Sequence, residues 1–180
     1  AGMTRGWVSE LPLRLSDILY GFPALLLAIL FAAALGGSTW TAMMAISLAT
    51  IPAFVRIARA ATLQVMSQGY IEAARLSGTP TATIAARHVL PNIAPVLGVQ
   101  ASVSFGIAIL AEAGLSYLGL GSGPDQPTWG RMLREAQDYL FSEPLLALWP
   151  GLAIAVATLG FNLLGDGLRD LLDPRLREVT

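Results

Sequence analysis

The polar side chains that could best do chemistry lie in one segment, between Arg56 and Pro91. It contains Glu72 and Arg75, then Gly78 and, ten residues later, His88. The spacing of three predicts that Glu72 and Arg75 pair on one helix face. A single histidine and no cysteine cannot form a thiolate site, a histidine metal site or a catalytic triad. From the residues alone, the segment is either a recognition element or a plain connector held by one ion pair.

Other polar residues give weaker signals. Glu112 lies at the end of a hydrophobic stretch, where an ionisable side chain is either functional or simply solvated. Glycines at 119, 121 and 123 lack the Gly-Lys-Ser/Thr that completes a phosphate-binding loop, so they predict a flexible turn region. Asp166, Asp170 and Asp173 are interpreted as solvated tail charges.

The elements that position these residues are hydrophobic. Of 180 residues, 54% are hydrophobic and 13% charged, whereas charged residues make up about 25% of a typical soluble domain. The mean hydropathy is +0.62. Charge-free windows cover Ile18–Val55, Val89–Ala111 and Pro144–Gly165. A bilayer crossing takes about 20 apolar residues, and the first window contains a turn at Gly36–Thr39. We therefore predict an all-α membrane protein with transmembrane helices at residues 18–35, 40–57, 93–112 and 144–165.

The distribution of arginine predicts the orientation, since the chain has no lysine. The loop at residues 58–92 and its flanks carry four arginines against one glutamate, whereas the loop at 113–143 and its flanks carry two arginines against five acidic residues. Cytoplasmic loops are enriched in basic residues. The first loop is thus predicted to be cytoplasmic and the second extracytoplasmic. The lead-in (1–17), the tail (166–180) and both termini are predicted to be cytoplasmic.

Local signals divide these segments further. Gly78 suits the position just after a helix, Thr79 the cap of the next helix and Pro80 its first turn. The pair Leu90-Pro91 is predicted to end that second short helix and to start the third span.

Two more features concern the first span and the outer loop. Gly21 and Pro23 permit a kink in the span at 18–35. In the outer loop, apolar residues at helical spacing predict a short surface helix over Arg131–Phe141.

The cytoplasmic loop resembles the "EAA" loop of permeases of binding-protein-dependent ABC importers. The match lies in Glu72-Ala73-Ala74, in Gly78 and in Leu90-Pro91. His88 stands where the general pattern has an isoleucine. The run from Arg87 to Asn92 resembles instead the peptide/nickel (dipeptide/oligopeptide) subfamily, specifically its second, C-type permease. Further segments agree with that subfamily, at residues 6–8, 17–19, 111–121, 128–130, 150–152, 161–170 and 173–175.

The resemblance implies a type I ABC importer permease fold with short cytoplasmic coupling helices. Four of the family's six transmembrane helices are present, so an N-terminal part is expected to be missing. The resemblance also implies that the loop couples to an ATPase through Tyr70, Glu72, Ala73, Ala74, Arg75, Gly78, His88, Leu90 and Pro91. Glu112 and Asn162, in two of the matching segments, are candidates for the translocation pathway or a gate.

The implied function is peptide import through half of a translocation pathway in a bacterial or archaeal plasma or inner membrane. The implied partners are a homologous second permease, two ABC ATPases that bind ATP and magnesium, and an extracytoplasmic substrate-binding protein. The chain itself is expected to be no enzyme and to hold no cofactor or metal, and nothing suggests nucleic acid. Alternatives are a permease for nickel or another small solute, a purely structural membrane subunit, or a fragment of an ion-coupled secondary transporter. The secondary transporter would call for inverted repeats and ionisable residues within its spans, and the sequence has neither.

Overall fold

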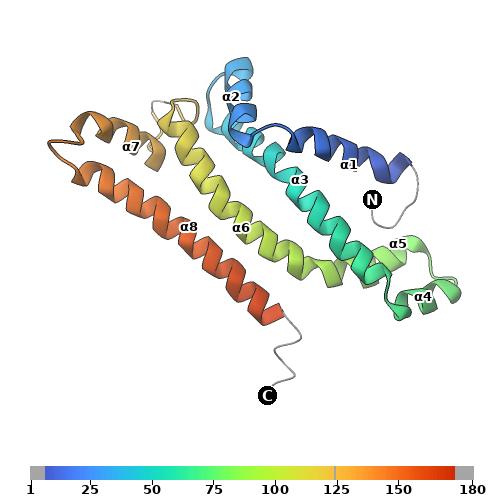
Figure 1. Cartoon of the computed structure of the whole chain (residues 1–180). Helices are drawn as coiled ribbons and strands as arrows, with labels where there is room; N and C mark the ends of the chain where they lie inside the picture. Colours follow the sequence, from blue (N-terminus) through green and yellow to red (C-terminus); the bar gives the residue numbers. More distant parts are fainter. Residues whose placement is uncertain (1–6, 124, 173–180) are drawn as a thin grey trace. The chain divides into compact units, whose positions relative to one another are not determined.

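The computed structural model describes residues 7–123 and 125–172, which form helices and turns without strands. The all-α class expected from the sequence is confirmed. Figure 1 shows three long helices, α3, α6 and α8, and several short ones. In chain order the elements are α1 (Trp7–Tyr20), α2 (Ala24–Leu35), α3 (Thr39–Met66), α4 (Gly69–Leu76), α5 (Thr81–Ile84), the π-helical turn η1 (Ala85–Val89), α6 (Leu90–Tyr117), α7 (Trp129–Ala136), the 3₁₀ turn η2 (Gln137–Tyr139) and α8 (Leu145–Leu172).

Three helical runs in the described residues are long and apolar enough to cross a membrane. They are α3, the continuous run Thr81–Tyr117 and the α8 segment Leu145–Leu171. These runs contain the predicted spans at 40–57 and 93–112 and, apart from Pro144, the span at 144–165. A fourth crossing is obtained only if the bent pair α1 and α2 is taken as one span.

The first predicted span is not a single helix, and this corrects the expectation for residues 18–35. The helix breaks between Tyr20 and Ala24, and Pro23 has φ −55° and ψ 129°, outside the helical region. Proline disfavours helical backbone in the residue before it, which here is Phe22. The 12 residues of α2 would be about 18 Å long at 1.5 Å per residue, shorter than the roughly 30 Å hydrocarbon core.

The long helices extend beyond the charge-free windows. α3 continues past residue 57 to Met66, through Arg56 and Arg59, and α8 continues past residue 165. Arginine is a good helix former, so a charge can end the apolar window without ending the helix. The beginning of the predicted cytoplasmic loop is therefore a helical extension of α3.

The outer helix also differs from its prediction. α7 begins at Trp129, before the expected start at Arg131, and ends at Ala136. The last turn of the predicted helix, at Gln137–Tyr139, is 3₁₀, a common way for an α-helix to end. The Thr128 side chain caps α7 by accepting from the Arg131 amide at 3.3 Å.

The described residues fall into two compact units. The first comprises residues up to 19, 51–101 and from 165 onward, and the second comprises 20–50 and 102–164. Each unit has a small buried cluster. The first contains what we call the α4 cluster, formed by Ile71, Ile84, Val89 and Ile93. The second contains the hairpin cluster, formed by Ala28, Ala42, Ala45 and Leu115.

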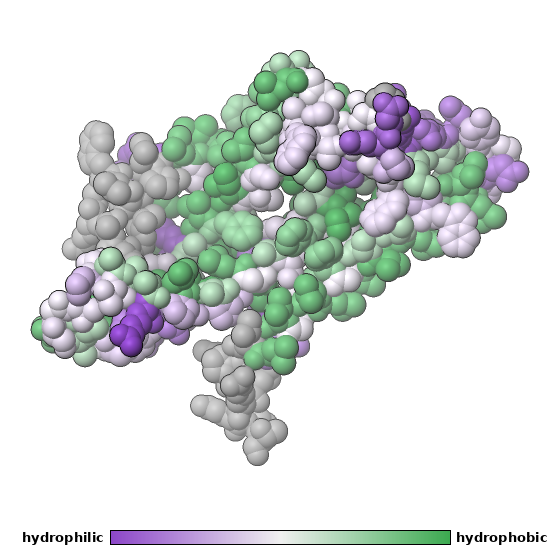
Figure 2. Space-filling model, turned by 180° about the vertical axis from the view of Figure 1, so that it is seen from behind, coloured by the Kyte–Doolittle hydropathy of each residue, from purple (hydrophilic) through white to green (hydrophobic). Residues whose placement is uncertain are grey.

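Most of the apolar surface is not covered by the chain itself. Only 22%, 17% and 11% of the best apolar windows in the three span candidates is buried. Figure 2 shows this surface on one face, with broad apolar areas and polar residues gathered in separate groups. Such surface is stable only against lipid or other apolar helices, as expected of a membrane protein.

Candidate functional site

The short helix α4 is anchored by one of its faces to the ends of α3 and α6. Ile71 is fully buried in the α4 cluster. Ala74, one turn later, packs against the same cluster, as do Val65 and Met66 of α3 and Leu97 of α6. Residues three apart share a helix face. Ala73 and Ala74, both implied in ATPase coupling by the resemblance, have different surroundings: Ala73 is exposed and Ala74 faces the cluster.

The end of α4 is a Schellman turn centred on Gly78. The Gly78 amide donates to the Arg75 carbonyl at 3.0 Å and the Thr79 amide to the Ala74 carbonyl at 3.1 Å. Gly78 has φ +76°, a backbone conformation that favours glycine. The predicted position of Gly78, just after the end of a helix, is confirmed. Thr79 does not cap the next helix, because α5 begins at Thr81 with Pro80 as its cap and without a side-chain cap bond.

The other side chains of the second half of α4 are exposed, namely those of Glu72, Ala73, Arg75 and Leu76. Leu76 is 87% exposed and, three residues after Ala73, lies away from the anchored face. In the described part of the chain, Glu72 and Arg75 form no ion pair, so the predicted pairing is wrong. Exposed pairs contribute only about 0–1 kcal/mol, because fixing two long side chains costs entropy.

The segment that leads into α6 is a π turn rather than a helix break. The Leu90 amide donates to the Ala85 carbonyl, five residues back, and the helical run continues to Tyr117. The expectation that Leu90-Pro91 ends a helix is therefore wrong. Pro91 has no amide proton and crowds the preceding turn, and a wider turn just before it accommodates the ring. The Asn92 side-chain nitrogen donates to the His88 carbonyl at 2.6 Å.

His88 and Tyr70 connect this π turn to α4. Their ring centroids lie 6.0 Å apart, tilted by 52°. His88 is half-buried, while Tyr70, Leu90 and Pro91 are exposed. The structure thus brings the predicted loop residues into one unit, with Tyr70 and His88 in mutual contact, Ala74 turned inward, and the remaining ones on its surface.

Glu112 and Asn162 belong to the other unit. The Glu112 carboxylate accepts from the Ser116 hydroxyl at 2.6 Å, and that hydroxyl oxygen accepts from the Ser122 amide at 3.3 Å. Glu112 therefore stabilises the turn that follows α6. Asn162 is exposed on α8, beside Gly106 of α6, where a Cβ would lie 3.1 Å from the Asn162 Oδ1.

Comparison with known proteins identifies the family. Residues 1–178 match the family described as the binding-protein-dependent transport system inner membrane component. The chain belongs to this family. The resemblance inferred from the EAA loop is thereby confirmed.

The curated relatives of this chain include permeases named for glutathione transport. The chain is 43% identical over 177 residues to the glutathione transport system permease protein GsiD of Pectobacterium atrosepticum, covering 98% of this chain and 59% of the relative. It is also 43% identical over 172 residues to the GsiD proteins of Escherichia coli O1:K1 and Shigella flexneri serotype 5b, covering 96% of this chain and 57% of each relative. The chain thus spans somewhat under three-fifths of the length of these relatives.

Proposed function

We propose that the chain acts as a permease subunit of an ABC importer for short peptides, with α4 as the helix that docks on a cytoplasmic ATPase. The observation that carries the proposal is the two-sided character of α4. Ile71 fixes one face to α3 and α6, while Leu76 is 87% exposed on the other. An exposed leucine beside two unpaired charges offers a partner an apolar contact with a polar rim.

The same anchoring supports a mechanism for coupling. The α4 cluster joins α4 to the ends of two long helices, so a displacement of α4 moves those helix ends with it. ATP drives transport when it binds two docked states with different affinity. Rigid-body movement of packed helices then alternates access across the membrane. ATP and magnesium belong to the partner ATPases in this proposal.

The substrate proposal rests on the relatives. Their name assigns them glutathione transport, and glutathione is a short peptide with free carboxylates and an amino group. We therefore place short peptides ahead of nickel and other small solutes. The uncovered apolar surface of the long helices supports a second permease subunit and lipid as neighbours, and an extracytoplasmic binding protein would deliver the solute.

The docking role is tested with Leu76→Ser and Glu72→Ala in the complete transporter. Both side chains are exposed, so folding should be unaffected. Loss of a central apolar anchor costs about 1–2 kcal/mol of binding, which corresponds to roughly tenfold weaker association with the ATPase. The measurements are co-purification of the ATPase and ATP-driven peptide uptake in proteoliposomes.

Further variants distinguish loss of docking from nonspecific loss of function. Glu143→Ala removes an exposed glutamate from the outer loop and should leave association and uptake unchanged. Gly78→Pro cannot keep the Schellman turn, since proline fixes φ near −65°, and should uncouple ATP hydrolysis from uptake. Wild-type uptake by both Leu76→Ser and Glu72→Ala would refute the docking role.

The orientation is proposed to place α4 and both termini in the cytoplasm and α7 outside. The chain has no cysteine, so single cysteines report position directly. A membrane-impermeant maleimide added to intact cells should label Phe141→Cys, since Phe141 is fully exposed. It should label Leu76→Cys only after permeabilisation. The reverse pattern would show that the orientation is inverted.

A further inference from the structure

The charged face of α7 borders a cavity of about 530 Å³. Binding sites for small molecules usually measure about 300–1,000 Å³. Arg131, Arg134 and Glu135 share this face by their spacing, and Asp138 follows in η2. The remaining lining residues come from the end of α6 and from the neighbouring turns: Ser116, Gly119, Ser122 and Gln137.

The walls of this cavity are held by close backbone packing. A Cβ on Gly130 would overlap the backbone of Ala113, so α7 lies directly against α6. A Cβ on Gly121 would likewise overlap the Ser116 hydroxyl. The segment expected as a flexible turn is thus packed against the end of α6. A preorganised wall lowers the entropic cost of binding a ligand.

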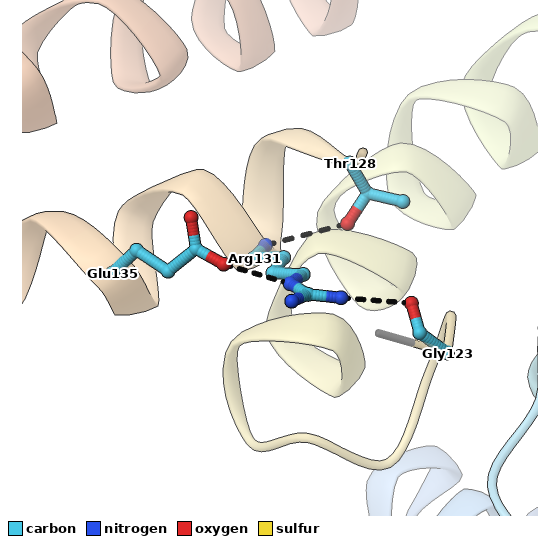
Figure 3. Close-up of polar contacts among 4 residues, drawn as sticks. All are labelled: Gly123, Thr128, Arg131 and Glu135. Carbon is cyan, nitrogen blue, oxygen red and sulfur yellow. Dashed lines mark hydrogen bonds and ion pairs between the residues drawn. The ribbon is translucent and has the colours of Figure 1, made fainter. Parts of the chain in front are cut away.

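Arg131 links α7 to the turn at Gly123 that borders the cavity. Its Nε donates to the Glu135 carboxylate at 2.8 Å and its Nη1 to the Gly123 carbonyl at 2.9 Å. Figure 3 shows both bonds, together with the Thr128 cap on the Arg131 amide. The Arg131 side chain is only 29% exposed. Its charge is matched by Glu135, so this pair adds no net charge to the cavity.

Arg134 and Asp138 are different, because neither side chain has a hydrogen bond or ion pair within the described ranges 7–123 and 125–172. They are four residues apart, in the same order as the paired Arg131 and Glu135. The 3₁₀ turn that carries Asp138 alters the helical spacing, which is the difference between the two pairs. The Arg134 guanidinium lies against Gly119. One free cation and one free anion therefore line the same cavity.

We propose that this cavity is a binding site for the charged ends of a short zwitterionic peptide, with Arg134 binding the carboxylate and Asp138 the ammonium group. A guanidinium binds a carboxylate through two parallel hydrogen bonds. The Gln137 side-chain oxygen accepts from the Tyr117 hydroxyl at 3.0 Å, and its amide nitrogen can donate to the peptide group between the two ends. The inference rests on the proposed peptide import and adds a site at which the peptide contacts this subunit.

The experiment measures binding of radiolabelled dialanine to the purified transporter complex without its binding protein. Saturable binding is expected for the wild type. Arg134→Gln should weaken it by roughly ten- to a hundredfold, because Arg134 would contribute charge-assisted hydrogen bonds that glutamine cannot make. Dialanine amide, which lacks the carboxylate, should bind the wild type and Arg134→Gln equally. Asp138→Asn should weaken dialanine but not its N-acetyl derivative.

Arg169→Gln is the matched control, since it removes an exposed arginine from α8 and should leave binding unchanged. Equal melting temperatures of the variants show that folding is intact. Absence of saturable dialanine binding, or wild-type binding by Arg134→Gln, overturns the inference. ATP-driven dialanine uptake with the binding protein present is measured in parallel. If uptake persists without saturable binding, only this inference fails, whereas absence of uptake by the wild type contradicts the proposed peptide import itself.

Discussion

Two helices of this chain, α4 and α6, end in the same glycine turn in very different surroundings. At the end of α6, the Leu120 amide donates to the Leu115 carbonyl at 2.9 Å and the Gly119 amide to the Ser116 carbonyl at 3.1 Å. Gly119 has φ +79°. These are the bonds and the conformation found at Gly78 after α4.

The difference lies in what surrounds each glycine. A Cβ at Gly78 would meet no atom within 4 Å, whereas at Gly119 it would overlap the Arg134 guanidinium. Leu120, after Gly119, packs on the hairpin cluster that contains Leu115, but the corresponding residue after Gly78 is the polar Thr79. The turn itself is set by local sequence. Tertiary packing decides whether the turn is open to solvent, as at Gly78, or packed against a neighbouring side chain, as at Gly119.

The largest effect is expected for Gly130→Ala, which tests how tightly the α7 region is packed. The new methyl group would overlap the Ala113 backbone, and neither side can move without shifting a helix. Overpacking of this kind costs about 3 kcal/mol. Unfolding of the solubilised chain in SDS, followed by circular dichroism, measures it. Gly114→Ala in α6 meets no atom within 4 Å and should be neutral or slightly stabilising. Equal stability of the two variants would contradict the close approach.

A smaller effect is expected when the two turn glycines are compared directly. Gly78→Ala should cost about 1 kcal/mol, from the left-handed backbone alone. Gly119→Ala should cost more, about 2 kcal/mol, since it adds displacement of Arg134 to that strain. The same SDS titration gives both values. A larger loss for Gly78→Ala than for Gly119→Ala would reverse the comparison.

Much of the fold follows from the sequence, because a bilayer imposes simple rules. Charge-free windows identified the three long runs, and the glycine rule identified the end of α4 at Gly78. The rules are less informative about helix ends outside the apolar windows. α3 continues to Met66 because arginine permits helix. The helix break before Ala24 was anticipated only as a kink.

The candidate site was less predictable, because it depends on which way side chains face. Sequence spacing allowed Glu72 and Arg75 to pair, but solvent competes successfully with an exposed ion pair. Ala74 turns inward because Ile71, three residues earlier, is the buried anchor. The free charges of Arg134 and Asp138 had no sequence signal, since a spacing of four allows a helical pair and the 3₁₀ turn that carries Asp138 was not predicted.

The π turn at Ala85–Val89 has a consequence for the register of α6. A turn closed by a bond to the fifth residue back holds one residue more than an α-helical turn. Deletion of one residue from this turn would therefore restore a regular helix without rotating α6 about its axis. With all five residues kept, the same change would rotate α6 by about 100°, because each residue of an α-helix turns by that angle. The π turn thus sets the direction in which the side chains of α6 face.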